Sequence, residues 1–157
     1  MSDERTTIVA DSGRPHGGLT RDEVVAMFER RQRAADALDA AAFAADYAPN
    51  ATIESPFAGP HVGPAAAEEA LRVFFEALRP KTTTESLLID GPRVVQVARL
   101  EGKNLGQLLG LPPSGKGFAV TLVVFCELED GQIVREQRIY DFSLLLMQVG
   151  LLKAKPI

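Results

Sequence analysis

The sequence predicts an α+β fold: a cone-shaped, curved antiparallel sheet with N-terminal helices packed on its concave side. Apolar residues repeat at helical spacing up to Pro80 and then alternate at strand spacing. The tight-turn sequences "DGPR" and "EDGQ" join successive strand-like runs into hairpins. Helices that precede a meander of strands are typical of an α+β domain, in which they pack on one face of the sheet.

Three helices are expected before Pro80. The first begins at Thr20, which has a glutamate three residues later and so forms a capping box. Asp39 caps a second, short helix, "DAAAFAADY", which the following "APN" ends. The third begins with Pro64 in its first turn. Its apolar residues form one stripe, made of Leu71, Phe74, Phe75 and Leu78.

Five segments are predicted to be strands. The first, "ATIES", is short and is stopped by Pro56. The other four follow the third helix and are, in chain order, "TTTESLLI", "RVVQVARLEG", "GFAVTLVVFCELE" and "QIVREQRIYDF". A long glycine- and proline-rich excursion, "GKNLGQLLGLPPSGK", interrupts this meander. The chain closes with "SLLLMQVGLL", a short helix or an irregular apolar segment.

Length and charge limit the class of protein. A chain of 157 residues is expected to form a single domain, here over residues 19–157, after a flexible leader over residues 1–18. The leader does not resemble a signal peptide, and no apolar run approaches the ~20 residues that cross a bilayer, so a cytoplasmic protein is expected. The net charge of −4 argues against a nucleic-acid or membrane-surface partner. Cys126 lies in an apolar run and is expected to be a buried thiol.

The predicted shape suggests both a ligand site and an assembly. A curved sheet closed by helices encloses an apolar concavity, which is the default place for a small apolar ligand. Apolar residues of both parities, as in "AVTLVVF", indicate that the sheet is buried on both faces. The helices cover one face, so another subunit is expected to cover the other in a homodimer or homotetramer.

Three segments resemble successive blocks of the SnoaL-like polyketide cyclase family: "YAPNATIESPFAG", "LEGKNLGQLLGLPPSGK" and "EDGQIVREQRIYDFSLLLMQVGLL". The resemblance covers roughly residues 19–152. This family belongs to the superfamily of nuclear transport factor, ketosteroid isomerase and limonene epoxide hydrolase. The resemblance implies a deep apolar pocket, no cofactor, and an aspartate that acts as acid and base on an apolar, oxygenated substrate. The two histidines, His16 and His61, are too few for a histidine-rich metal site, so no metal is expected.

The chain departs from the ketosteroid isomerases of this superfamily at three positions. Ser55 stands where their general base precedes a proline, and a serine cannot move a carbon-bound proton at neutral pH. Their oxyanion-hole tyrosine would fall about at Arg31, and their second acidic donor about at Val123. Isomerase chemistry of that type is therefore not expected.

The last strand departs from the family as well. Arg99 and Glu101 resemble the arginine–acid part of an epoxide hydrolase triad, on one face of a strand. Arg138 stands where the remaining aspartate of that triad is expected. Many cyclases of the family also carry two acids spaced by three there, and this chain keeps only the second, Asp141. Asn104 stands where relatives often show a histidine.

The candidate catalytic residues are Asp141 for proton transfer, with Arg99 and Arg138 to stabilise oxyanion charge. Asp141 could instead cap a terminal helix. Arg138 could instead lie on a solvated strand face, or pair with Glu136 or Glu101. Substrate-binding candidates are Tyr47, Glu54, Glu101 and Asn104.

Arg99 shares a strand face with Val95 and Val97, so it is expected to be buried. A buried arginine needs a carboxylate partner, which Glu54, Glu101 or Asp141 could supply.

Two classes of function remain open. One is a cofactor-independent cyclase- or isomerase-type enzyme, with an epoxide-hydrolase-like enzyme as a variant. The other is a non-catalytic module that binds a small ligand and has lost its acid.

Overall fold

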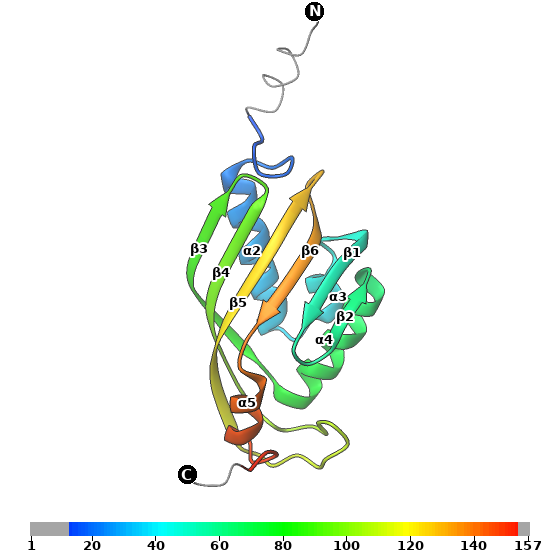
Figure 1. The fold of residues 1–157 in the computed structure, drawn as a ribbon, viewed down its shortest axis with the longest axis vertical. Helices are drawn as coiled ribbons and strands as arrows, with labels where there is room; N and C mark the ends of the chain where they lie inside the picture. Colours follow the sequence, from blue (N-terminus) through cyan, green and yellow to red (C-terminus); the bar gives the residue numbers. More distant parts are fainter. Residues whose placement is uncertain (1–12, 154–157) are drawn as a thin grey trace, which may run out of the picture.

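The computed structural model describes residues 13–153 (Figure 1). In chain order the elements are α2 (Arg21–Asp36), α3 (Ala40–Ala44), β1 (Tyr47–Ser55), β2 (Gly59–Val62), α4 (Pro64–Leu78), β3 (Lys81–Asp90), β4 (Arg93–Lys103), β5 (Gly117–Glu129), β6 (Gln132–Ile139) and α5 (Phe142–Gln148). No helix within residues 13–153 has the length and hydropathy that would let it cross a membrane.

The six strands form one curved sheet in the order β2-β1-β6-β5-β4-β3. Figure 1 shows α2, α3 and α4 together behind this sheet, and α5 at the end of the molecule where the chain terminates. The hairpin turns "DGPR" and "EDGQ" join β3 to β4 and β5 to β6 as predicted. The α+β prediction, with helices on the concave side of a curved sheet, is confirmed.

The first strands differ from the prediction. β1 begins at Tyr47, whereas the sequence predicted a helix up to this residue and a strand only from Ala51. Tyr47 pairs with Ile133 of β6, so a contact with a distant strand overrides the local helical pattern. The pairing of β1 with β6 is also parallel, and the prediction of a purely antiparallel sheet is wrong there. No hairpin joins these two strands, so no turn fixes their relative direction.

The short strand β2 was not predicted. It pairs only with β1 and lies at the edge of the sheet. Its sequence, "GPHV", contains a glycine and a proline, and both residues weaken a strand pattern read from sequence alone. An edge position accommodates Pro60 because a proline has no N–H to donate to a second neighbour.

The helix boundaries follow local signals. The Thr20 side chain accepts a hydrogen bond from the Glu23 N–H at 3.2 Å, and the Glu23 side chain accepts one in return from the Thr20 N–H. Asp39 caps α3 by accepting from the Ala42 N–H at 3.0 Å. Pro64 occupies the first turn of α4. Each predicted cap is therefore confirmed.

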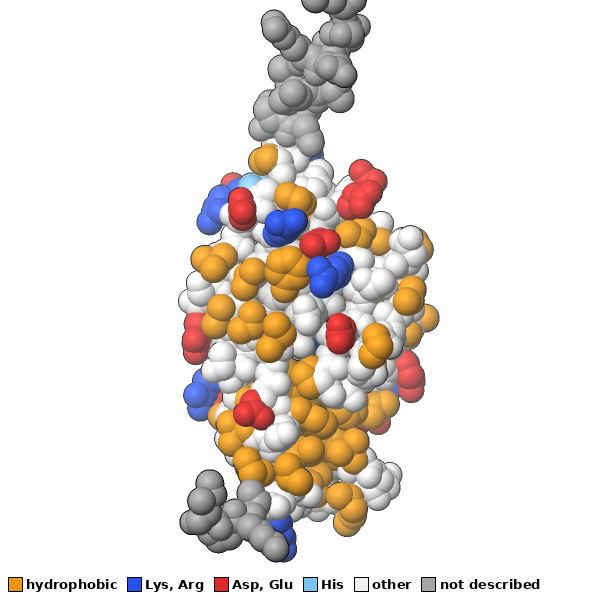
Figure 2. All heavy atoms as spheres, in the orientation of Figure 1, with side chains coloured by type: hydrophobic (Ala, Val, Ile, Leu, Met, Phe, Trp, Pro, Cys, Tyr) orange, Lys and Arg blue, Asp and Glu red, His pale blue; other side chains and the backbone are white. Residues whose placement is uncertain are grey.

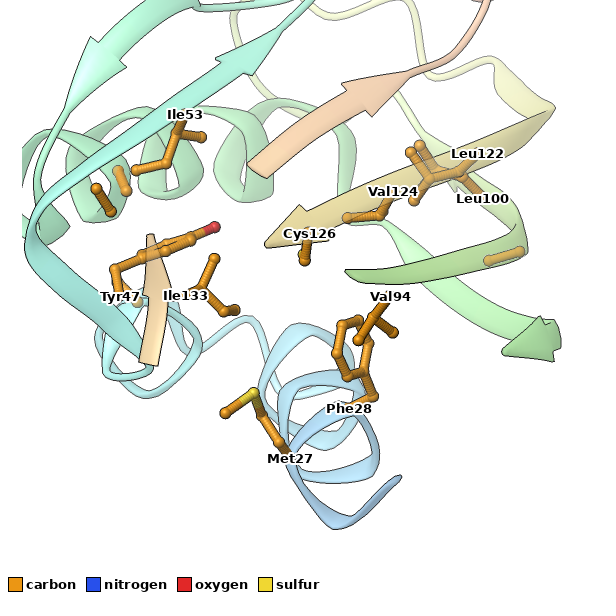
Figure 3. Close-up of a cluster of buried hydrophobic side chains, with 14 of the residues drawn as sticks. Met27, Phe28, Tyr47, Ile53, Val94, Leu100, Leu122, Val124, Cys126 and Ile133 are labelled. Atoms are coloured by element: carbon orange, nitrogen blue, oxygen red, sulfur yellow. The ribbon is translucent and has the colours of Figure 1, made fainter. Parts of the chain in front are cut away.

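The core lies between the concave face of the sheet and the helices. On β4, Val94, Gln96, Ala98 and Leu100 are buried, whereas Val95, Val97 and Arg99, which alternate with them, face the convex side. Figure 3 shows Met27 and Phe28 of α2 pointing toward the sheet, with Phe28 next to Val94. This alternation decides which polar side chains can reach the interior.

The predicted leader falls partly outside the described residues, which begin at residue 13. Within them, His16 Nδ1 lies 2.7 Å from the Gly91 carbonyl oxygen. Gly131 N–H donates to the Gly17 carbonyl at 2.8 Å. The chain thus contacts both hairpin turns from His16 onward, a few residues before the expected start at Leu19.

Candidate functional site

Three buried polar side chains and one largely buried arginine meet inside the cone, and we call them the Glu136 cluster: Arg31, Tyr47, Glu136 and the partly exposed Arg138. Arg31 Nη2 lies 2.6 Å from Glu136 Oε1, and Arg138 Nε lies 2.8 Å from Glu136 Oε2. The Tyr47 hydroxyl donates to Glu136 Oε2 at 2.5 Å. The same hydroxyl accepts from Arg31 Nη2 at 3.0 Å and from Arg138 Nη2 at 2.8 Å. Each member is thus bound to at least two others.

Strand alternation and one helix position bring the cluster together. Glu136 and Arg138 are two residues apart on β6, so their side chains share its concave face. Cys126 pairs with Glu136 across β5 and β6, and its thiol donates to Glu136 Oε1 at 3.3 Å. Arg31 comes from α2, and its guanidinium lies 4.2 Å from the ring centroid of Phe43. The arginine is therefore held by a carboxylate and by an aromatic face.

The cluster keeps fixed charges at neutral pH. Burial by itself would raise the pKa of Glu136, but the positive charges of Arg31 and Arg138, with hydrogen bonds from Tyr47 and Arg31, lower that pKa to about 2. Burial raises the pKa of the Tyr47 hydroxyl and of the Cys126 thiol above their ordinary values. Glu136 is therefore ionised, and it is not poised to transfer protons near neutral pH.

An apolar pocket opens beside the cluster, on the concave face of the sheet. Its aromatic wall consists of Phe28, Phe43, Phe57, Phe74, Phe75 and Tyr140. Its polar side chains are Arg31, Gln32, Ser55, Thr82, Gln96 and Arg138. Phe57 and Phe74 meet edge to face, with ring centroids 5.4 Å apart. Such a wall suits a flat or ring-shaped apolar ligand. Arg31 and Arg138 are the charged groups of the pocket.

The described residues that line this pocket include few groups that can act as an acid or a base. Among the described residues that line it there is no aspartate, glutamate or histidine. Burial raises the pKa of Tyr140 to about 12, so this hydroxyl remains a hydrogen-bond donor at neutral pH. The Ser55 hydroxyl accepts from the Ala58 N–H at 3.0 Å. The lining can donate hydrogen bonds and stabilise negative charge, but it does not offer a carboxylate base.

Two of the predicted site residues belong to this region. Arg138 lines the pocket, and it also pairs with Glu136, as one of its alternatives stated. Tyr47 lies directly behind Arg138 in the Glu136 cluster.

Asp141 is instead the N-cap of α5. Its Oδ1 accepts from the Leu144 N–H at 2.8 Å, and the residue is exposed. The capping alternative for Asp141 is therefore confirmed.

Arg99 and Glu101 lie on the convex face of the sheet. Their side chains are 56% and 45% exposed, and Arg99 Nε lies 3.6 Å from Glu101 Oε2. The prediction that Arg99 is buried on the pocket face is wrong, whereas its pairing with Glu101, one of the three carboxylates expected, is confirmed. Strand alternation correctly grouped Arg99 with Val95 and Val97, but that face turns away from the helices.

The remaining two candidates also lie away from the pocket. Glu54 is exposed, on the face of β1 opposite to the buried Ile53 and Ser55. Asn104 is buried, donates to the Gly106 carbonyl at 2.9 Å and accepts from the Ser114 N–H at 2.7 Å. It therefore holds the long connection between β4 and β5 in place.

Sequence reasoning missed Arg31 and Glu136 as site residues, although a signal existed for both. Arg31 lies three and four residues after Phe28 and Met27, so it falls on the apolar stripe of α2. A charged residue inside such a stripe needs a buried partner. Glu136 precedes Arg138 by two residues and thus had to share its face.

Comparisons with known proteins agree with this architecture. The family model described as SnoaL-like polyketide cyclase matches residues 26–149. Nogalonic acid methyl ester cyclase from Streptomyces nogalater is 30% identical over 107 residues, which are 67% of this chain and 78% of that protein.

Solved structures show the same fold. TsrD from Streptomyces laurentii superimposes with a TM-score of 0.75 at 24% identity, covering 85% of this chain and 99% of that one. An NTF2-like protein of unknown function from Burkholderia pseudomallei gives a TM-score of 0.69 at 14% identity, covering 82% and 98%. These likenesses concern the fold, and the match of the family model over most of the chain shows that this protein belongs to the SnoaL-like polyketide cyclase family.

Proposed function

We propose that the protein is a cofactor-independent, cyclase-type enzyme that binds an apolar, oxygenated small molecule in the aromatic pocket. One observation carries the proposal. Arg138 lines that pocket while Glu136 and Tyr47 fix its guanidinium from behind. A charged group that is already oriented stabilises a developing oxyanion without reorganising during the reaction.

This arrangement of donors suits ring closure of the aldol type. A carbon–hydrogen bond breaks, an enolate forms, and its carbon attacks a carbonyl group of the same molecule. Arg138 would hold the enolate oxygen, and the Tyr140 hydroxyl is a second donor on the pocket wall. The described residues of the lining include no carboxylate or imidazole, so the proton would leave to water in the pocket and return from water to the new alkoxide.

The lack of a carboxylate or imidazole side chain among the described lining residues favours a second candidate function. A pocket whose described lining residues include no aspartate, glutamate or histidine also fits a module that binds such a molecule without converting it. Asp141 does not restore the acid, because its carboxylate accepts a backbone hydrogen bond at the start of α5.

Turnover of a polyketide separates the two candidates. The purified protein is incubated with nogalonic acid methyl ester, and ring closure is followed by liquid chromatography and NMR. We expect Arg138→Met to lower kcat by about a hundredfold or more, as loss of an oxyanion donor does. Arg99→Met, on the convex face, is the matched control and should retain activity.

The outcomes of this assay are distinct. Binding without conversion by the wild-type protein would favour the binding module. Equal turnover by the two arginine variants would contradict the role proposed for Arg138.

We further propose that a second copy of the chain covers the convex face of the sheet. Apolar side chains follow each other across three strands in one row, formed by Val97, Val123 and Ile139. Ile139 is 51% exposed, and Figure 2 shows hydrophobic side chains spread over the sheet between scattered charges. Sedimentation should give a dimer at micromolar concentration, and Val123→Asp should give a monomer. A monomeric wild-type protein would contradict this assembly.

A further inference from the structure

The Glu136 cluster contains more positive than negative charge. Arg31 and Arg138 are both buried or nearly so, with side chains 3% and 12% exposed, and Glu136 is their shared carboxylate. The remaining groups within hydrogen-bond distance, Tyr47 and Cys126, are neutral at physiological pH. Two cations and one anion leave one positive charge inside the cone.

Part of the hydrogen-bonding capacity of these arginines is unused by the described residues. Arg31 Nε is buried and has no hydrogen-bond partner among them. The hydrogen bonds that Arg138 makes to the cluster use Nε and Nη2. Both arginines line the pocket. A buried donor without a partner and a buried charge without a counterion are each costly, so the site is incomplete as it stands.

The other polar groups of the pocket do not supply the missing negative charge. Gln96 Nε2 donates to the Thr84 hydroxyl at 2.8 Å, and that hydroxyl donates to Gln32 Oε1 at 2.5 Å. These groups are neutral, and the two lining residues Gln32 and Gln96 are both engaged with Thr84, which lies outside the lining. A ligand is therefore the available source of a counterion.

We infer that the pocket binds its ligand as a monoanion, an aromatic or polycyclic molecule whose carboxylate, phenolate or enolate oxygen lies against Arg31 and Arg138. This inference rests on the proposed function, whose substrate it defines by charge. Amines and other cationic ligands are excluded because they would add a second positive charge beside the arginines. The aromatic wall holds the rings, and the two guanidinium groups select the ionised form.

A size-matched pair of probes tests the charge preference. The probes are 2-naphthoate and 2-naphthamide, which differ mainly in the charge of one small group. The chain contains no tryptophan, so naphthalene fluorescence can be followed without an indole background. We expect naphthoate to bind at least about tenfold more tightly, as a charge-assisted hydrogen bond would require. In Arg138→Met this ratio should fall toward about one, whereas Arg99→Met should keep it.

Each result has a definite meaning. Equal affinity of both probes for the wild-type protein overturns the inference and leaves the proposed aromatic pocket standing. Binding of neither probe counts against the pocket itself and therefore against the proposed function. If Arg138→Met fails to fold by circular dichroism, Arg138→Lys replaces it, and a preference for naphthoate should persist because the charge is kept.

A third probe distinguishes the kinds of anion. The affinity for 2-naphthol is measured below and above the pKa of its own hydroxyl group. Tighter binding as the probe ionises supports an oxyanion site that includes phenolates and enolates. An unchanged affinity, with naphthoate still preferred, restricts the site to carboxylates and overturns the enolate and phenolate part of the inference.

Discussion

Two arginine–glutamate pairs on the same sheet show how strongly position changes the role of one motif. Arg138 and Glu136 are two residues apart on β6, and Arg99 and Glu101 are two residues apart on β4. The first pair is 12% and 0% exposed with its charged atoms 2.8 Å apart, whereas the second is 56% and 45% exposed at 3.6 Å. The two pairs lie on opposite faces of the sheet. The spacing of residues along a strand therefore indicates which side chains contact each other, but not how much the contact contributes to stability.

The surroundings of the two pairs explain the difference. The Glu136 pair receives Arg31 from α2 and Tyr47 from β1, which replace the water that the charges lost on burial. Arg99 has Thr83 and Thr121 as its cross-strand neighbours and keeps its contact with water. An exposed pair contributes little to stability, whereas breaking a buried one leaves an uncompensated charge.

Removing each carboxylate in turn should give the largest contrast. We expect Glu136→Gln to lower the free energy of unfolding by about 3–5 kcal/mol, because it leaves two buried arginines without a counterion. Glu101→Gln, the matched variant on the convex face, should change it by less than about 1 kcal/mol. Urea denaturation followed by circular dichroism measures both. Similar losses in the two variants would show that the faces do not differ as the geometry indicates.

Acid should weaken the buried pair in a defined range of pH. The pKa of Glu136 is about 2 in the folded chain and about 4.5 for an ordinary glutamate. A lowered carboxyl pKa gives stability that is present above about pH 4.5 and is lost as the pH falls toward 2, about 3 kcal/mol in all. The stability advantage of the wild-type protein over Glu136→Gln should therefore shrink across this range. A difference that stays constant down to pH 2 would contradict the lowered pKa.

Asp141 provides a third carboxylate, which acts on the backbone. Asp141→Ala should cost about 1 kcal/mol of stability, because the first turn of α5 loses its cap. Asp141→Ser should retain most of that stability, since a serine can also accept the Leu144 N–H. Thermal unfolding compares the three proteins, and naphthoate titration should give the same affinity for each. A loss of turnover in Asp141→Ser with stability preserved would return Asp141 to the list of catalytic candidates.

The smallest effect is expected at Arg99. Arg99→Met should change the free energy of unfolding by no more than about 0.5 kcal/mol, because its partner is half-exposed and solvent screens the pair. Ligand affinity should not change either. A large loss of ligand affinity in this variant would mean that the convex face takes part in the site.

Local signals predicted much of the architecture. Thr20, Asp39 and Pro64 mark helix starts because each acts on backbone groups within a few residues. The hairpin turns are equally local. The start of β1 and the existence of β2 were not predicted, because these strands form through pairing with β6 and with each other.

The predicted site residues likewise divide into those that lie at the pocket and those that do not. Of the residues expected from sequence, Arg138 and Tyr47 lie at the pocket and its polar base, whereas Glu54, Arg99, Glu101 and Asn104 lie elsewhere. For the strand residues Glu54, Arg99 and Glu101, alternation correctly predicted which neighbouring side chains share a face. Alternation assigns residues to two faces, and it contains no information on which face the helices will cover.

The sequence by itself determined the helix caps, the hairpins, and the grouping of Glu136 with Arg138 and of Arg99 with Glu101. Tertiary structure alone decided that the first group is buried and charged against Arg31, a residue 105 positions away from Glu136. The reason is that caps and turns satisfy hydrogen bonds between near neighbours. Burial, by contrast, depends on which distant surfaces pack together, and burial sets the energy of every charge in this pocket.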